Sequence, residues 1–401
     1  MSNPYLQLFQ APGTRGFALA GLIARMPISM TGIGIITMLS QLRGSYGLAG
    51  AVAATFAFCC AIMAPQVSRL VDKHGQGKIL PPAAAISVAG MAALLICVWQ
   101  DAPDWSLFAC AVLAGFMPSM PAMVRARWTE VYRGQPLLQT AYALETVLDE
   151  VCFIIGPPIS VGLSVALFPQ AGPLVAMLLL AVGVAAFILQ KGSEPSIHAA
   201  THHENNSVIR YAEVRILTLL LIAMGVIVGT VDVVSVAFAQ NQGLPAAASI
   251  VLSVYAIGSC AAGLLFGAVK ISTPLQKLFL YCGAATALAT LPMLLAWNIA
   301  TLAVAVGIAG LFFAPSMIVA MGLVESAVPS AKLTEGLTWL ITGLGIGVSI
   351  GAAASGWVVD IAGARTGFLV ALAAGAAVLL ISLYGYGVLR RKQMPVPALS
   401  A

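Results

Sequence analysis

The chain has 401 residues, of which 60% are hydrophobic and only 8% charged, and its mean hydropathy is +0.98. Because a water-soluble globular domain carries about 25% charged residues, this composition excludes a soluble protein. The net charge of +5 is not gathered into a basic stripe, so nothing in the sequence indicates a nucleic-acid-binding surface. These values indicate an all-α protein that crosses a membrane several times.

Continuous apolar runs long enough to cross a bilayer, about 20 residues each, recur along the chain and predict twelve transmembrane helices. In chain order the predicted spans cover 16–39, 48–70, 79–99, 105–124, 137–165, 172–190, 214–239, 247–269, 277–297, 300–324, 333–358 and 367–389. The longest connection, 191–213, is polar and is predicted to be a cytoplasmic linker. It divides the chain into an N-terminal six-helix bundle (1–190) and a C-terminal six-helix bundle (214–401).

The basic residues indicate which side of the membrane each connection faces, since cytoplasmic loops carry an excess of Lys and Arg. With the N-terminus in the cytoplasm, 16 of the 19 basic residues fall in or beside cytoplasmic segments. Arg125 and Arg127 belong to this set, at the cytoplasmic end of the fourth span. The outer loops hold only Arg43 and Arg365, and Arg25 lies within the first span. The distribution predicts that both termini are cytoplasmic.

Short segments of the first half recur in the second half at nearly one offset. LAGFMPSM around Gly115 resembles IAGLFFAPSM around Gly310, which lies 195 residues later. Gly156 in the fifth span falls 195 residues before Gly351 in the eleventh. A shared offset close to half the chain favours duplication of a six-helix unit. Since six is an even number, the two copies have the same topology and can be related by an axis along the membrane normal.

A charged segment, SRLVDKHGQGK (68–78), follows the second span. Its acid, Asp72, can contact Lys73, Lys78 or the positive N-terminus of another helix. Such a contact would hold one conformation of the two bundles and open in the other. The alternative is an ordinary turn between two helices that carries the cytoplasmic positive charge.

This segment is similar to the G-x-L-a-D-R-x-G-R-R loop that follows the second helix in the major facilitator superfamily. Ser68 stands in place of the first glycine, Gly75 matches the second, and Lys78 lies just beyond the position of the usual basic pair. The six-plus-six arrangement and the polar central connection resemble the same family. The resemblance implies twelve transmembrane helices in two bundles and transport by alternating access.

Four charged residues lie at comparable depth within the first and fifth spans: Arg25, Glu145, Asp149 and Glu150. A charge at mid-bilayer costs about 3 kcal/mol on insertion scales, so each of them needs a partner or a function. Glu145 and Asp149 are four residues apart and share a helix face. We expect Arg25 to pair with one of them, and since one base cannot neutralise three acids, a remaining carboxyl is predicted to bind a coupling proton. The alternative is a static polar cluster that braces the first helix against the fifth.

Asp232 lies in the outer third of the seventh span, which is expected to line the central cavity in this fold. It is a candidate for contacting the substrate or a second proton. The alternative is an acid that reaches the outer membrane interface.

Gly156-Pro157-Pro158 in the fifth span is similar to a pattern that exporters of the family carry in their fifth helix. Glycine allows close helix approach, and proline kinks a helix because it removes a backbone hydrogen bond. The match is partial, because Cys152 replaces the first glycine and the predicted fourth span, 105–124, contains no arginine. The pattern favours export over import.

An enzyme is the alternative from another class, because GVSIG (347–351) fits the G-x-S-x-G pattern of serine hydrolases. That pattern needs a strand-turn-helix context and a histidine partner, whereas Ser349 lies in the middle of a predicted span. We interpret these glycines as helix-packing residues. The histidine-rich stretch 198–203 is interpreted as a solvated part of the linker, so no catalytic or metal site is predicted.

The sequence therefore favours a secondary active transporter that exports a small organic molecule, amphiphilic or drug-like, in exchange for protons. The alternatives are a proton symporter or uniporter for uptake, or a membrane sensor that does not transport its ligand. The expected partners are the substrate, protons and the lipid bilayer, with no nucleic acid and no cofactor, because the proton gradient supplies the energy. We expect a monomer in a bacterial inner (plasma) membrane.

Overall fold

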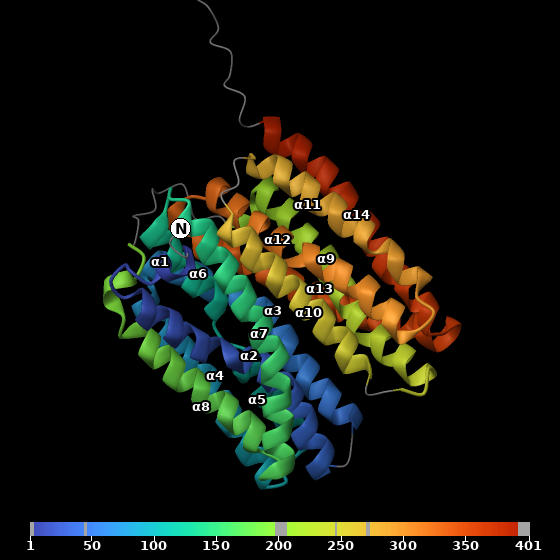
Figure 1. The fold of residues 1–401 in the computed structure, drawn as a ribbon. Coiled ribbons are helices and arrows are strands. Elements are labelled where there is room, and N and C mark those ends of the chain that lie inside the picture. Colours follow the sequence, from blue (N-terminus) through green and yellow to red (C-terminus); the bar gives the residue numbers. More distant parts are fainter. Residues whose placement is uncertain (1–3, 44–45, 197–206, 245–246, 270–272, 392–401) are drawn as a thin grey trace, which may run out of the picture. The chain divides into compact units, whose positions relative to one another are not determined.

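The computed structural model describes residues 4–43, 46–196, 207–244, 247–269 and 273–391, and every regular element in these ranges is a helix (Figure 1). The centre of the predicted linker, 197–206, lies outside the described residues together with its histidine-rich stretch. The extreme chain ends lie outside them as well.

The helices of the first half follow the first six predicted spans, with one short helix added before them. They are α1 (Pro4–Leu8), α2 (Thr14–Arg43), α3 (Tyr46–His74), α4 (Gln76–Trp99), α5 (Asp104–Ala114), α6 (Met120–Tyr132), α7 (Leu137–Ala166) and α8 (Ala171–Ile188). A 3-10 turn, η1 (Lys191–Ser193), follows α8.

The helices of the second half follow the last six predicted spans. They are η2 (Val208–Arg210), α9 (Ala212–Asn241), α10 (Ala247–Ala268), α11 (Leu275–Ala289), η3 (Leu291–Leu295), α12 (Ile299–Ala327), η4 (Ser330–Lys332), α13 (Leu333–Ala362) and α14 (Ala364–Arg391). Of the helices in the described ranges, eleven are long and apolar enough to cross a membrane.

The fourth predicted span is the exception, because it is not one helix. The apolar run 105–124 predicts a continuous helix, but α5 ends at Ala114 and α6 begins only at Met120. Pro118 has no backbone N–H to donate, and Pro121 occupies the first turn of α6, where proline is tolerated. The second piece then runs eight residues past the predicted end of the span, to Tyr132.

The chain forms two compact units. The first contains Met1–Ser207 and the short segment Ser330–Thr338, and the second contains Val208–Pro329 and Trp339–Ala401. The main boundary thus falls inside the predicted linker. The beginning of α13 belongs to the first unit although the rest of α13 belongs to the second, an assignment that no sequence pattern predicts.

Within each unit a glycine of the duplicated pattern brings two helices together. In the first unit α2 packs against α7 and α8 (Figure 1), and a Cβ at Gly156 of α7 would overlap Oγ of Ser29 in α2. In the second unit a Cβ at Gly351 of α13 would overlap the carbonyl oxygen of Val226 in α9. Both contacts join the first and fifth helices of their own unit.

The second glycine pair of the repeat behaves in the same way. A Cβ at Gly115, directly after α5, would overlap Cβ of Cys59 in α3. A Cβ at Gly310 in α12 would overlap the carbonyl oxygen of Tyr255 in α10. The glycines that match at an offset of 195 residues therefore have equivalent packing roles within their units, as a duplicated six-helix unit requires.

Candidate functional site

The charged residues of the first and fifth spans meet inside the first unit. Arg25 of α2 is 1% exposed and forms ion pairs with two acids of α7. Its Nη2 pairs with Oε2 of Glu145, and its Nη1 donates to Oδ1 of Asp149 at 2.8 Å. The expected pairing is present, and it involves both candidate carboxylates rather than one.

Asp149 has a second cationic partner that sequence reasoning missed. Nη2 of Arg125 donates to Oδ2 of Asp149 at 2.7 Å, and the Arg125 side chain is fully buried. By sequence, Arg125 is grouped with the basic residues beside cytoplasmic segments, and the structure adds that α6 buries it inside the unit, where it pairs with Asp149. Every residue of α6 from Met120 to Thr129 is buried, although a search for apolar runs ends the span at residue 124.

The charge count of the cluster changes with this second arginine. Two guanidinium groups, from α2 and α6, face two carboxylates on α7, so this core is electrically neutral when both acids are ionised. Removing one member of a buried pair leaves an uncompensated charge, which is strongly destabilising. The expectation that a single base faces three acids was therefore wrong.

Glu145 is held by a neutral donor in addition to Arg25. Nε1 of Trp128, in α6, donates to Oε1 of Glu145 at 2.7 Å, and both side chains are fully buried. An indole N–H is only a donor, so Oε1 of Glu145 is an acceptor here, while Oε2 accepts from Arg25. Both oxygens of Glu145 are thus occupied by buried partners.

Trp128 is itself fixed by aromatic neighbours. Its ring meets Phe17 edge-on, with 4.7 Å between ring centroids, and stacks on Tyr132 at 6.0 Å. The hydroxyl of Tyr132 donates to the carbonyl of Leu8 at 2.9 Å, which attaches the end of α1 to the same group of rings. These contacts fix the position of Trp128, and therefore of its hydrogen bond to Glu145, against α1 and the beginning of α2.

The acid after the second span binds a helix N-terminus. Oδ1 of Asp72 accepts from the backbone N–H of Thr334 at 3.1 Å, and Oδ2 accepts from that of Glu335 at 2.7 Å. The first N–H groups of a helix have no partner inside the helix and carry partial positive charge, so a carboxylate stabilises them. Of the three partners expected for Asp72, the structure shows the N-terminus of another helix, α13.

The remaining residues of this segment have distinct roles. Oγ of Ser68 is buried and lies 2.7 Å from Oγ1 of Thr338, one turn further along α13. Gly75, between α3 and α4, has φ 92° and ψ 154°, a region that is essentially restricted to glycine. Lys73 and Lys78 are exposed and form no ion pair within the described part of the chain.

The family model described as Major Facilitator Superfamily matches residues 17–270, which is more than half of the chain. The chain belongs to the Major Facilitator Superfamily. No curated protein sequence matches it significantly. Members of this superfamily are secondary transporters, and the fold agrees with that assignment.

Solved structures of three transporters, one of them described as a Major Facilitator Superfamily transporter (FucP), have the same fold. The human organic anion transporter MFSD10 (TETRAN) is 13% identical, with a TM-score of 0.71 over 94% of this chain and 100% of that one. A bacterial homologue of the iron transporter ferroportin, in an outward-facing state, is 13% identical with a TM-score of 0.73 over 93% and 99%. FucP in the outward conformation is 13% identical with a TM-score of 0.68 over 92% and 98%. At these identities the likeness concerns the fold alone.

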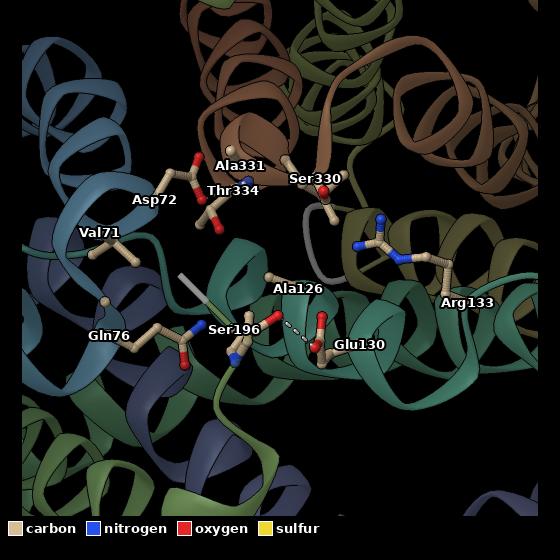
Figure 2. Close-up of a pocket in the computed structure, with 13 residues that line it drawn as sticks. Val71, Asp72, Gln76, Ala126, Glu130, Arg133, Ser196, Ser330, Ala331 and Thr334 are labelled. Atoms are coloured by element: carbon tan, nitrogen blue, oxygen red, sulfur yellow. Dashed lines mark hydrogen bonds between the residues drawn. The ribbon is translucent and has the colours of Figure 1, made fainter. Parts of the chain in front are cut away.

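A small polar cavity lies beside Asp72 in this superfamily member (Figure 2). It holds about 20 Å³, enough for one water molecule but not for an organic substrate. Its walls include Asp72, Arg133 and Glu130, and Oγ of Ser196 donates to Oε1 of Glu130 at 3.0 Å (Figure 2). The cavity therefore belongs to the Asp72 contact and in this conformation is too small for an organic substrate.

The predicted site contains two further acids. Glu150 follows Asp149 in α7 and is partly exposed. Asp232 lies on α9 in the second unit with an exposed side chain, and it forms no ion pair in the described ranges. The transport roles of both acids stay predictions.

The fifth-helix pattern lies within a helix that does not stop at its prolines. α7 continues through Pro157 and Pro158 to Ala166, and Gly156 supplies the close approach to Ser29. This agrees with the packing role expected for the glycine. The kink expected at the prolines and its link to export stay predictions.

The serine-hydrolase pattern has a packing explanation in this transporter. Ser349 lies in the middle of α13, where its Oγ donates to the carbonyl of Gly345 at 3.1 Å. A Cβ at Gly347 would overlap the carbonyl oxygen of Ile222, and one at Gly225 would overlap that of Leu344. The glycines thus let α9 and α13 pack closely within the second unit, as expected from the sequence.

Proposed function

We propose that the protein is a proton-coupled transporter of a small organic molecule and that Asp149 binds the coupling proton. One observation carries this proposal: Asp149 bridges the buried guanidinium groups of Arg25 and Arg125 while its own side chain is 18% exposed. An ionisable group inside the membrane is a functional candidate because its insertion is costly. Asp149 combines that cost with access to a proton.

Protonation of Asp149 would remove the charge on which both arginines converge. The link from α2 through α7 to α6 would then weaken, so proton binding and the arrangement of these helices are energetically coupled. Glu145 does not suit this role, because it is fully buried and its oxygens are occupied by Arg25 and Trp128. We assign Glu145 to the support of Arg25.

The contact of Asp72 with α13 supports a conformational role for the 68–78 segment. Only the beginning of α13 belongs to the first unit, and Asp72 and Ser68 hold that beginning in place. Release of two capping hydrogen bonds would free it at a cost of about 0.5–2 kcal/mol. This magnitude suits a contact that forms in one transport state and breaks in another.

The fifth-helix pattern and the charged cluster favour different directions of proton movement relative to the substrate. The partial match at Gly156-Pro157-Pro158 favours export in exchange for protons. The charged cluster favours movement of proton and substrate together, because the groups that Asp149 would release are two arginines, which bind anions. We give precedence to the cluster, whose contacts involve both oxygens of Asp149, and keep proton exchange as the second candidate. The distribution of basic residues supports cytoplasmic termini, and the bacterial inner membrane stays a prediction.

The experiment is proton movement in proteoliposomes that contain a trapped pH indicator. Purified protein is exposed to a panel of organic anions, cations and neutral molecules, with and without an imposed pH gradient. We expect at least one compound to cause protein-dependent proton movement in the wild type and in Glu150→Gln, and none in Asp149→Asn. Movement in the direction of the substrate indicates symport, and movement against it indicates exchange.

Two results would contradict the assignment of Asp149. Proton movement that persists in Asp149→Asn would exclude it as the carrier. Loss in Glu150→Gln with retention in Asp149→Asn would move the carrier to the next residue of α7. Substrate movement without any proton signal would return the whole cluster to a structural role.

A further inference from the structure

We propose that the transported molecule carries a single anionic group, and that Arg25 and Arg125 bind this group in the place that Asp149 occupies here. The proposal rests on the function proposed above, since it requires Asp149 to take up a proton. It adds the chemical class of the substrate and the two residues that select it.

The geometry around Asp149 is that of a bound carboxylate. Each of its oxygens accepts a charge-assisted hydrogen bond from a different guanidinium, Oδ1 from Arg25 at 2.8 Å and Oδ2 from Arg125 at 2.7 Å. The two donors come from different helices, α2 and α6, and converge on one group. Paired guanidinium donors are a preferred arrangement for recognising carboxylates and phosphates. The side chain of Asp149 thus fills a site whose donors suit the anionic group of a ligand.

The charge count limits the occupant to one negative charge. When Asp149 is protonated, two guanidinium groups face the single carboxylate of Glu145, which stays paired with Arg25 and Trp128. The core then has a net charge of +1, located at the fully buried Arg125. One anionic group restores neutrality, whereas a second negative charge would have no counter-ion among Arg25, Arg125 and Glu145.

Two further observations favour replacement of Asp149 by a ligand. Nε of Arg125 is buried and has no hydrogen-bond partner in the described part of the chain, so a spare donor remains even with Asp149 bound. Asp149 is 18% exposed, against 1% or less for Arg25, Arg125 and Glu145. The replaceable member of the cluster is therefore the one that is accessible.

The proposed substrate charge determines whether transport responds to the membrane potential. One proton and one monovalent anion move together without net charge. Transport is then driven by the pH gradient and does not respond to the membrane potential, whereas co-transport of a neutral molecule with a proton would respond to both.

The test uses anion binding to purified protein, measured as the rise in thermal unfolding temperature with ligand concentration. The probes are benzoate, phenylacetate and naphthalenesulfonate, each compared with its uncharged amide, and the sulfonate stays ionised throughout. Asp149→Asn reproduces the neutral state of the residue; because it also leaves the buried Arg125 without its counter-ion, its folding is verified by a cooperative unfolding transition, and the wild type at acidic pH gives the same neutral state without a substitution. The double variant Asp149→Asn/Arg125→Gln removes the unpaired cation while it keeps the Arg25–Glu145 pair, so its core is neutral and it is expected to fold.

In Asp149→Asn we expect at least one anion to bind ten times or more tightly than its amide, at acidic and alkaline pH alike. The wild type should bind it only at acidic pH, and the double variant should not distinguish anion from amide. If no anion binds Asp149→Asn more tightly than its amide, or if the double variant binds it equally well, the proposal is wrong.

The outcomes separate this proposal from the proposed function. Anion binding that needs Arg125 but is independent of pH in the wild type would keep the anion site and reject Asp149 as the proton carrier. Proton movement that needs Asp149 but is caused only by neutral or cationic compounds would keep the carrier and reject the anion site.

Discussion

Trp128 and Glu145 lie on different helices and are joined by a hydrogen bond of 2.7 Å between two fully buried side chains. The bond leaves Glu145 with both oxygens occupied, because Arg25 takes the other one. Two acids one helical turn apart on α7 therefore have different surroundings: Glu145 is enclosed and Asp149 is accessible. Because of this difference, we assign proton binding to Asp149 and the positioning of Arg25 to Glu145.

Trp128→Phe should destabilise the protein, because it leaves a buried acceptor of Glu145 without its donor. The aromatic contacts with Phe17 and Tyr132 are largely kept, so the loss is mainly that of the hydrogen bond, about 1–3 kcal/mol. Thermal unfolding of purified protein measures it. Trp105→Phe is the matched control, since Trp105 is exposed on α5, and an equal loss in both variants would contradict the role of the bond.

Gly156→Ala should lower both stability and transport, because the added Cβ would overlap Oγ of Ser29 and force α2 and α7 apart. Overpacking of this kind costs about 1–3 kcal/mol. Ser29→Gly in the same chain should restore much of the loss, since it removes the atoms in conflict. Gly162→Ala, further along α7, meets no atom within 4 Å and should be neutral. Failure of Ser29→Gly to rescue would show that another property of Gly156 matters.

Asp72→Ala should loosen the first turn of α13. Two backbone N–H groups, of Thr334 and Glu335, lose their acceptor, which corresponds to about 0.5–2 kcal/mol. Hydrogen exchange of the peptide that contains them should accelerate by about 2- to 30-fold. Asp72→Asn keeps an acceptor and should lie between the wild type and alanine. Lys73→Ala removes an exposed neighbouring charge and should leave exchange unchanged; acceleration there would indicate a general effect of the loop.

Hydropathy and periodicity predict much of this fold because the bilayer constrains it strongly. Twelve apolar runs, the six-plus-six division and the pairing of Arg25 with α7 all follow from length, burial and depth. The glycine pairs at an offset of 195 could likewise be predicted, since close helix packing recurs in both units. For Asp72, the local sequence narrowed its partner to three candidates but could not choose the N-terminus of α13, which lies far along the chain.

Arg125 shows where sequence reasoning fails. The apolar run that ends at residue 124 leaves the arginine outside the predicted span, with no indication that α6, which follows the break after α5, buries it inside the first unit. Pro118 and Pro121 were the available signals of that break. A hydropathy average does not detect a short break between two helices. Whether a charged residue after the break is buried depends on tertiary packing. The charge balance of the cluster could therefore not be derived from the sequence.

Infrared difference spectroscopy on pH change tests the central claim most directly, because the C=O stretch of a carboxylic acid appears only when the acid is protonated. All 14 Asp and Glu residues contribute to the carboxylic-acid band that grows on acidification; we predict that one component of this band is present in the wild type and in Glu150→Gln and is missing in Asp149→Asn. A band of unchanged shape and intensity in Asp149→Asn would contradict the account, since none of its components would then belong to Asp149.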